Sequence, residues 1–129
     1  MDKPTILIAE DDFLIREGYL EPLLAPHFSL VASVGDGSEA VAAATAHRPS
    51  VALLDVSLPG LRGFEAARRI LQTQPECKVL LVSNYIQATY IETAREMGLS
   101  GYVLKSRIQT DLLPAIQSAL EGGFYQSTL

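Results

Sequence analysis

The sequence predicts an α/β fold, a doubly wound parallel sheet of five strands with helices on both faces. Five short apolar runs alternate with longer segments of helical periodicity, roughly one unit per 26 residues, which is close to the length of a βα unit. The runs are continuously apolar, as is typical of parallel strands covered on both faces. A chain of 129 residues with 48% hydrophobic and 19% charged residues can build one packed core without disulfides. The predicted strands are Thr5–Ala9, Leu30–Val34, Val51–Leu54, Lys78–Val82 and Gly101–Leu104.

The segments between and after these runs predict five helices, each with apolar residues three or four positions apart. Asp36 precedes the second helix as a start signal and Pro49 ends it. Gly98 is the predicted cap of the fourth helix, and Gly122 and Gly123 are predicted to end the fifth. The apolar stripes, in order, are Leu14, Ile15, Tyr19, Leu20 and Leu23; Ala40, Val41, Ala44 and Thr45; Phe64, Ala67, Ile70 and Leu71; Ile91, Ala94 and Met97; and Leu112, Leu113, Ile116, Ala119 and Leu120.

Polar residues stand at four of the five strand ends. Glu10 and Asp11 follow the first run, and Asp55, Ser83 and Lys105 stand at the ends of the third, fourth and fifth. Right-handed crossovers bring the carboxyl ends of all strands to one edge of the sheet, where such folds bind ligands. We therefore expect these five side chains to share one site.

The chemistry of such a site follows from its charges. Two carboxylates about 4 Å apart repel by ~4 kcal/mol at an effective dielectric of 20, so Glu10, Asp11 and Asp55 together must take up a proton or a cation. An all-oxygen ligand set suits Mg²⁺. A metal, a hydroxyl and an ammonium around one carboxylate favour phosphoryl transfer to that carboxylate. Each residue alone is more often a turn residue, a cap or a surface charge, and Asp12 is predicted to cap the first helix.

Four segments resemble the receiver domain of two-component response regulators: Ile6–Gly18, Val51–Glu65, Val79–Tyr85 and Gly101–Ser106. The resemblance covers the chain from Ile6 to about Leu120. It implies a (βα)5, flavodoxin-like fold with strand order 2-1-3-4-5. It also implies Mg²⁺-dependent transfer of a phosphoryl group from the phosphohistidine of a sensor histidine kinase to Asp55. Such a chain is a signalling phosphoacceptor that catalyses only its own phosphorylation and dephosphorylation, and is not otherwise an enzyme.

The resemblance also assigns the metal ligands. It implies that Asp11 and Asp55 bind Mg²⁺ directly, that Ser57 offers its backbone carbonyl, and that Glu10 binds through water. Glu10 departs from the family pattern, which has aspartate at this position.

The remaining roles concern switching. The resemblance makes Ser83 the switch hydroxyl, Lys105 the partner of the phosphoryl group, and Tyr102 the aromatic residue that turns inward when the hydroxyl engages phosphate. Asn84 stands where the family usually has alanine, and a bulkier residue there is expected to alter phosphorylation or hydrolysis rates. Ser106 stands where many members have a cis proline, which leaves the isomer of its peptide bond open.

The stretch from Asp111 to Leu129 resembles the end of the receiver in NarL/LuxR-type regulators. We expect residues 1–121 to be the receiver and 122–129 to begin a linker or tail, with a DNA-binding helix-turn-helix output domain absent from this chain. The chain itself, at net charge −5, is not expected to contact nucleic acid. The fourth helix, fifth strand and fifth helix are the expected output face, which commonly supports dimers. A single cysteine, Cys77, fits a cytoplasmic protein, and no apolar run is long enough to span a membrane.

Four other interpretations stay open on the sequence. The chain could be a stand-alone receiver that acts by protein–protein interaction, or a pseudo-receiver that is never phosphorylated. A flavodoxin-like FMN protein would need a phosphate loop where this chain has Glu10–Asp12. A haloacid-dehalogenase-like phosphatase would need an acid in place of Ser57.

Overall fold

The computed structural model describes residues 3–128. The described chain forms one parallel sheet with strand order β2-β1-β3-β4-β5-β6, which confirms the predicted fold class and the order of the first five strands. Met1, Asp2 and Leu129, assigned above to the receiver and to the following linker or tail, lie outside the described residues. The strands are β1 (Thr5–Ala9), β2 (Ser29–Val34), β3 (Val51–Asp55), β4 (Lys78–Ser83), β5 (Gly101–Leu104) and β6 (Tyr125–Gln126).

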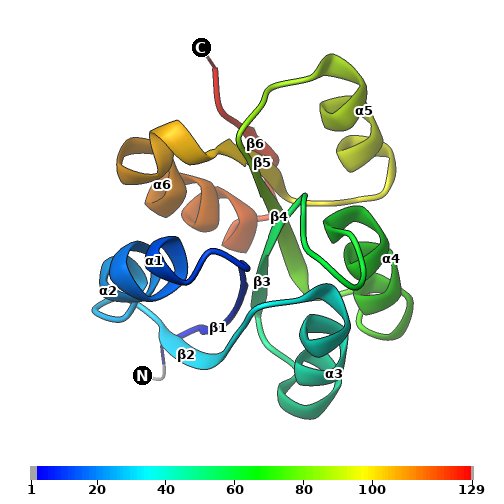
Figure 1. Cartoon of the computed structure of the whole chain (residues 1–129). Coiled ribbons are helices and arrows are strands. Elements are labelled where there is room, and N and C mark those ends of the chain that lie inside the picture. Colours follow the sequence, from blue (N-terminus) through cyan, green and yellow to red (C-terminus); the bar gives the residue numbers. More distant parts are fainter. Residues whose placement is uncertain (1–2, 129) are drawn as a thin grey trace.

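Helices cover both faces of this sheet (Figure 1). On one face α3, α4 and α5 pack against the sheet, and on the other the first helical segment and α6 do so. No helix in the described part of the chain is both long and apolar enough to cross a bilayer. The helical elements are α1 (Phe13–Ile15), a π turn η1 (Arg16–Leu20), α2 (Glu21–Leu24), α3 (Gly37–His47), α4 (Gly63–Thr73), α5 (Ala88–Glu96), a 3₁₀ turn η2 (Lys105–Arg107) and α6 (Ile108–Leu120).

The strand register aligns the polar strand ends. Ala9 of β1 lies opposite Leu54 of β3, so the residues that come directly after them are neighbours at the same edge. Ser83 of β4 lies opposite Leu104 of β5 in the same way. Because side chains alternate between faces along a strand, a slip of one residue would turn these groups away from each other.

The first helix departs from the predicted stripe. Leu14 was expected in its apolar face, but its side chain is 69% exposed, while Leu20 and Leu24 are buried. The π turn Arg16–Leu20 adds a residue to the helical turn, which rotates the residues before the turn by ~100° relative to the residues after it. Pro22, which lacks an N–H donor, comes shortly after the turn and explains why the regular ladder is broken here.

A sixth strand lies at the edge of the sheet, in a region that the sequence assigns to a linker or tail. Tyr125–Gln126 pair in parallel with β5. The preceding Gly122 has φ +88°, a left-handed conformation that glycine adopts without strain and that turns the chain back towards the sheet after α6. A two-residue strand has too short a pattern to be recognised in a sequence.

Candidate functional site

An acidic cluster occupies the carboxyl edge of the sheet. Glu10, Asp11 and Asp55 each offer one carboxylate oxygen, and these atoms all lie within 4.8 Å of one another. Glu10 is 2% exposed and Asp55 3%, whereas Asp11 faces solvent. The structure thus brings together the three acids predicted from the sequence, and their oxygens are ligands that suit a hard divalent cation.

Lys105 lies against two of these acids. Its Nζ is 2.8 Å from Oε1 of Glu10 and 3.0 Å from Oδ2 of Asp55. Burial raises the pKa of Glu10 to about 7, and the hydrogen bond from Lys105 offsets this only in part. Burial alone would lower the pKa of Lys105, but the bonds that its ammonium donates to the two acids outweigh burial and raise it. The pocket therefore stabilises the charge of Lys105 but only partly offsets the cost of burying the charge of Glu10.

The loop after β1 is held by two further residues. Asp12 caps α1, as predicted, by accepting hydrogen bonds from the N–H groups of Leu14 and Ile15. Its own N–H donates to Oε2 of Glu10 at 3.0 Å. Arg16 reaches back from the π turn, and its Nη1 donates to the backbone carbonyl of Glu10 at 2.6 Å. The sequence did not point to Arg16, because nothing in its spacing reveals a bond to a backbone atom six residues away.

The loop after β3 packs tightly on the central aspartate. The N–H of Ser57 donates to Oδ1 of Asp55 at 3.0 Å. Gly60 has φ +75°, so the predicted Pro59–Gly60 turn uses a conformation that suits glycine. A Cβ atom on Gly63 would overlap the backbone carbonyl of Asp55, so only glycine lets α4 begin this close to β3.

Ser83 and Tyr102, to which the sequence assigns roles in switching, lie on the neighbouring strands β4 and β5. Ser83 ends β4, is buried, and accepts a hydrogen bond from the N–H of Tyr85 at 3.1 Å. The side chain of Tyr102 points inward and is fully buried, and its hydroxyl donates to the carbonyl of Tyr85 at 2.7 Å. Burial raises the pKa of that hydroxyl. Asn84 is exposed, and no peptide bond among residues 3–128 is cis, so the Lys105–Ser106 bond is trans.

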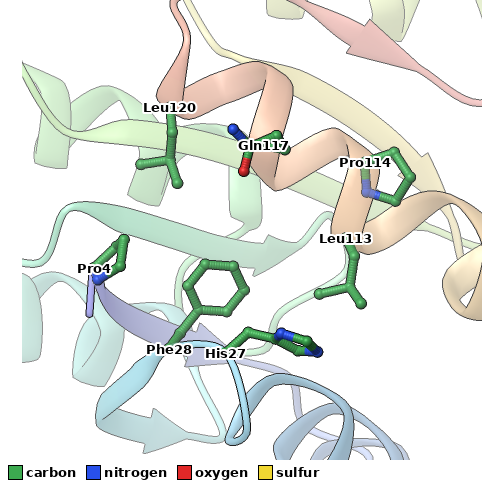
Figure 2. Close-up of a pocket in the computed structure, with 7 residues that line it drawn as sticks. All are labelled: Pro4, His27, Phe28, Leu113, Pro114, Gln117 and Leu120. Atoms are coloured by element: carbon green, nitrogen blue, oxygen red, sulfur yellow. The ribbon is translucent and has the colours of Figure 1, made fainter.

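A separate groove of about 500 Å³ lies at the other end of the strands, near the start of β1, and is lined by residues of α6 (Figure 2). His27 is the one titratable side chain among its lining residues, so it lacks the acids and the amine of the first site. Figure 2 shows the ring of Phe28 between α6 and Pro4. The lining residues are Pro4, His27, Phe28, Leu113, Pro114, Gln117 and Leu120.

The structure is a flavodoxin-like receiver fold: a parallel sheet that carries three acids and a facing lysine at the carboxyl ends of its strands. The family model of the response regulator receiver domain matches residues 6–117 of this sequence. The chain belongs to this family.

Curated relatives agree with that assignment. The chain is 35% identical over 125 residues to the transcriptional regulatory protein DegU from Brevibacillus brevis, covering 96% of this chain and 53% of the relative. It is also 35% identical over 115 residues to the transcriptional regulatory protein PdtaR from Mycobacterium tuberculosis, covering 89% and 56%. The chain spans about half the length of the curated relatives it matches.

Solved structures show the same fold. A LuxR-family two-component response regulator from Aurantimonas sp. SI85-9A1 superposes with a TM-score of 0.87 at 30% identity, covering 96% of this chain and 89% of the other. A LuxR-family DNA-binding response regulator from Staphylococcus aureus superposes with a TM-score of 0.83 at 28% identity, covering 91% and 98%.

Proposed function

We propose that Asp55 accepts a phosphoryl group from the phosphohistidine of a sensor histidine kinase. The observation that carries this proposal is one buried carboxylate that lies beside an ammonium and two further acids at the carboxyl ends of the strands. A surface aspartate in a turn would not need Lys105 at 3.0 Å. A location in the cytoplasm, where such kinases present their phosphohistidine, is part of the proposal.

The residues of the cluster fit Mg²⁺. Asp11 and Asp55 would bind it directly, together with the backbone carbonyl of Ser57, and Glu10 would bind through water. Three carboxylates whose oxygens lie within 4.8 Å of one another carry more negative charge than the single ammonium of Lys105 neutralises. When bound, the ion supplies a positive charge that offsets the charge of the transferring phosphoryl group.

The chain's own residues account for the rest of the reaction. A carboxylate oxygen of Asp55 forms a bond to phosphorus while the bond from phosphorus to the donor nitrogen breaks, and the electron pair of that bond leaves with the histidine. The ammonium of Lys105 would move from the carboxylate to a phosphoryl oxygen, where it stabilises negative charge. The hydroxyl of Ser83 would donate to another phosphoryl oxygen.

The same movements of Ser83 and Lys105 would change the surface of the protein at α5, β5 and α6. When Ser83 turns towards the phosphoryl group, it gives up its bond from the N–H of Tyr85, and the loop that leads into α5 can shift. The inward side chain of Tyr102 bonds that same loop. Couplings of this kind are typically ~1–3 kcal/mol. We propose that the face of α5, β5 and α6 responds and controls a DNA-binding output domain, as the LuxR-family relatives suggest, with dimerisation as part of that response.

The test is incubation of the protein with Mg²⁺ and acetyl phosphate, read by intact mass. We expect one phosphate-sized adduct, which is lost in Asp55→Asn and in the presence of a chelator. Asp12→Asn is the matched control, because asparagine caps a helix as well as aspartate does, and it should keep the adduct. A wild-type protein that gains no adduct under these conditions would be a pseudo-receiver, and the proposal would fail.

A further inference from the structure

A short segment, Phe124–Ser127, lies along the side of β5 away from the centre of the sheet. Part of it forms β6, and Figure 1 shows this strand next to β5 between α5 and α6. The N–H of Tyr125 donates to the carbonyl of Ser100 at 3.1 Å, and the N–H of Ser127 donates to the carbonyl of Tyr102 at 3.0 Å. Residues 125–127 of the segment are therefore paired with the backbone of β5 and of Ser100, the residue before it.

A side chain of α5, Arg95, holds one part of this segment. The guanidinium carbon of Arg95 lies 4.1 Å from the centre of the Phe124 ring, a cation–π contact. Nη2 of the same arginine donates to Oε1 of Gln126 at 3.2 Å. One side chain of α5 thus contacts two residues of the segment.

Ser127 holds the other part and joins it to α6. It is 1% exposed, and its Oγ donates to Oδ2 of Asp111 at 2.6 Å. The same Oγ accepts the N–H of Leu104 at 3.0 Å. Arg107 completes the cluster by bonding the carboxylate of Asp111 at 3.1 Å. If Ser127 left, the buried N–H of Leu104 would lose its hydrogen-bond partner, which disfavours release of the segment.

We propose that the face formed by α5, β5 and α6 is a binding surface that the chain's own segment Phe124–Ser127 occupies. Docking of this segment is coupled to the binding of a phosphoryl group or its analogue at Asp55. The coupling rests on the phosphoacceptor function proposed above. The docking itself rests only on the contacts of the segment.

Strand β5 connects the two sites through adjacent atoms. Tyr102 receives the N–H of Ser127 on its carbonyl, while its side chain holds the loop after Ser83 through the carbonyl of Tyr85. Leu104 donates to Ser127 and directly precedes Lys105, whose ammonium contacts the acids. The backbone that binds the segment therefore also places the inward tyrosine and the lysine.

The sign of the coupling follows from this arrangement. The segment is docked in the same structure in which Tyr102 lies inward and Lys105 reaches Asp55. A ligand on Asp55 that binds the ammonium of Lys105 within the pocket and keeps Tyr102 inward stabilises the backbone of β5, to which the segment binds. By linkage, a docked segment must strengthen binding of that ligand by the same factor.

Hydrogen–deuterium exchange of the full chain tests the proposal, with Mg²⁺ and beryllofluoride as the probe at Asp55. We expect the probe to slow exchange in the peptide that contains Phe124–Ser127 several-fold more than in β2, which lies at the opposite edge of the sheet and reports general stabilisation. Ser127→Ala should speed exchange of the segment about tenfold and weaken beryllofluoride binding several-fold. Thr128→Ala, a neighbouring exposed residue, should change neither quantity.

The outcomes separate this proposal from the phosphoacceptor function. If acetyl phosphate leaves no adduct on Asp55, the function proposed for the site is wrong and the coupling falls with it. If the adduct forms but the segment responds to beryllofluoride no more than β2 does, the coupling alone is wrong. Equal exchange in Ser127→Ala and the wild type would overturn the docking.

Discussion

Replacing Lys105 by methionine is the most direct test of the electrostatics of the pocket. The substitution keeps most of the apolar stem but removes the ammonium that lies 2.8 Å from Glu10 and 3.0 Å from Asp55. Both acids are almost fully buried, so the variant leaves buried carboxylates without their cation. Breaking a buried pair in this way costs about 3 kcal/mol or more of folding free energy, out of about 5–15 kcal/mol for a domain of ordinary stability.

The loss should depend on pH because Glu10 can escape its burial by binding a proton. In the wild type its pKa is raised to about 7, and without Lys105 the pKa rises further. At a pH between its unfolded-state and its folded-state pKa, such a carboxyl group is protonated in the folded protein but ionised in the unfolded chain. Over that range the free energy of unfolding falls by about 1.36 kcal/mol for each unit of increase in pH. In the wild type this loss ends near pH 7, the folded-state pKa of Glu10, whereas in the variant, with its higher pKa, it continues to about pH 8.5. We expect a loss of about 3 kcal/mol at about pH 5.5 and about 5 kcal/mol at about pH 8.5.

Urea unfolding followed by circular dichroism, with a chelator present, measures both values. Lys78→Met is the matched control, because Lys78 forms no ion pair within residues 3–128. Adding Mg²⁺ should restore more stability to Lys105→Met than to the wild type, since the ion replaces the missing positive charge. A loss that is the same at both pH values, or no larger than that of Lys78→Met, would refute the electrostatic reasoning.

Two further substitutions probe the supports of the site, and a third measurement tests the burial of a core thiol. Arg16→Met removes a charged hydrogen bond to the carbonyl of Glu10, so it should lower the free energy of unfolding by about 1–3 kcal/mol and weaken Mg²⁺ binding measured by calorimetry. Arg48→Met, which removes an exposed ion pair with Glu76, should change neither quantity. Gly63→Ala brings a Cβ atom onto the carbonyl at the end of β3 and should cost more than about 2 kcal/mol in urea unfolding or prevent folding; a variant as stable as the wild type would contradict the close approach. Burial raises the pKa of Cys77 to about 11, so at about pH 8 only about 0.1% is thiolate and alkylation should be far slower than in urea; equal rates would show that the thiol is accessible.

The sequence predicts the parallel sheet because the relevant patterns are local. Each strand run is continuously apolar, and its polar neighbour comes directly after it, so the edge that holds Glu10, Asp11 and Asp55 can be inferred without coordinates. The helix caps Asp12 and Asp36 were also predictable, since a capping side chain bonds N–H groups two or three residues away.

Features that depend on contacts distant in the sequence were not predictable. Arg16 bonds a backbone carbonyl, and any donor of suitable length could do so, so its residue type carries no signal. The exposure of Leu14 depends on an inserted residue in the turn, which a 3.6-residue period cannot represent. The buried position of Ser127 arises from Asp111 and Leu104, which are 16 and 23 residues away.

The short strand β5 explains why site and face are physically connected. Its side chains alternate, so Tyr102 packs with the core under α5 and Val103 with the core under α6. Its backbone binds β4 on one side and β6 on the other. Because β5 has only four residues, a shift of the backbone at Lys105, which follows its last residue, also shifts the bond from the N–H of Leu104 to Ser127. A coupling between phosphoryl chemistry and an outer face thus needs no long chain of contacts, because one strand belongs to both.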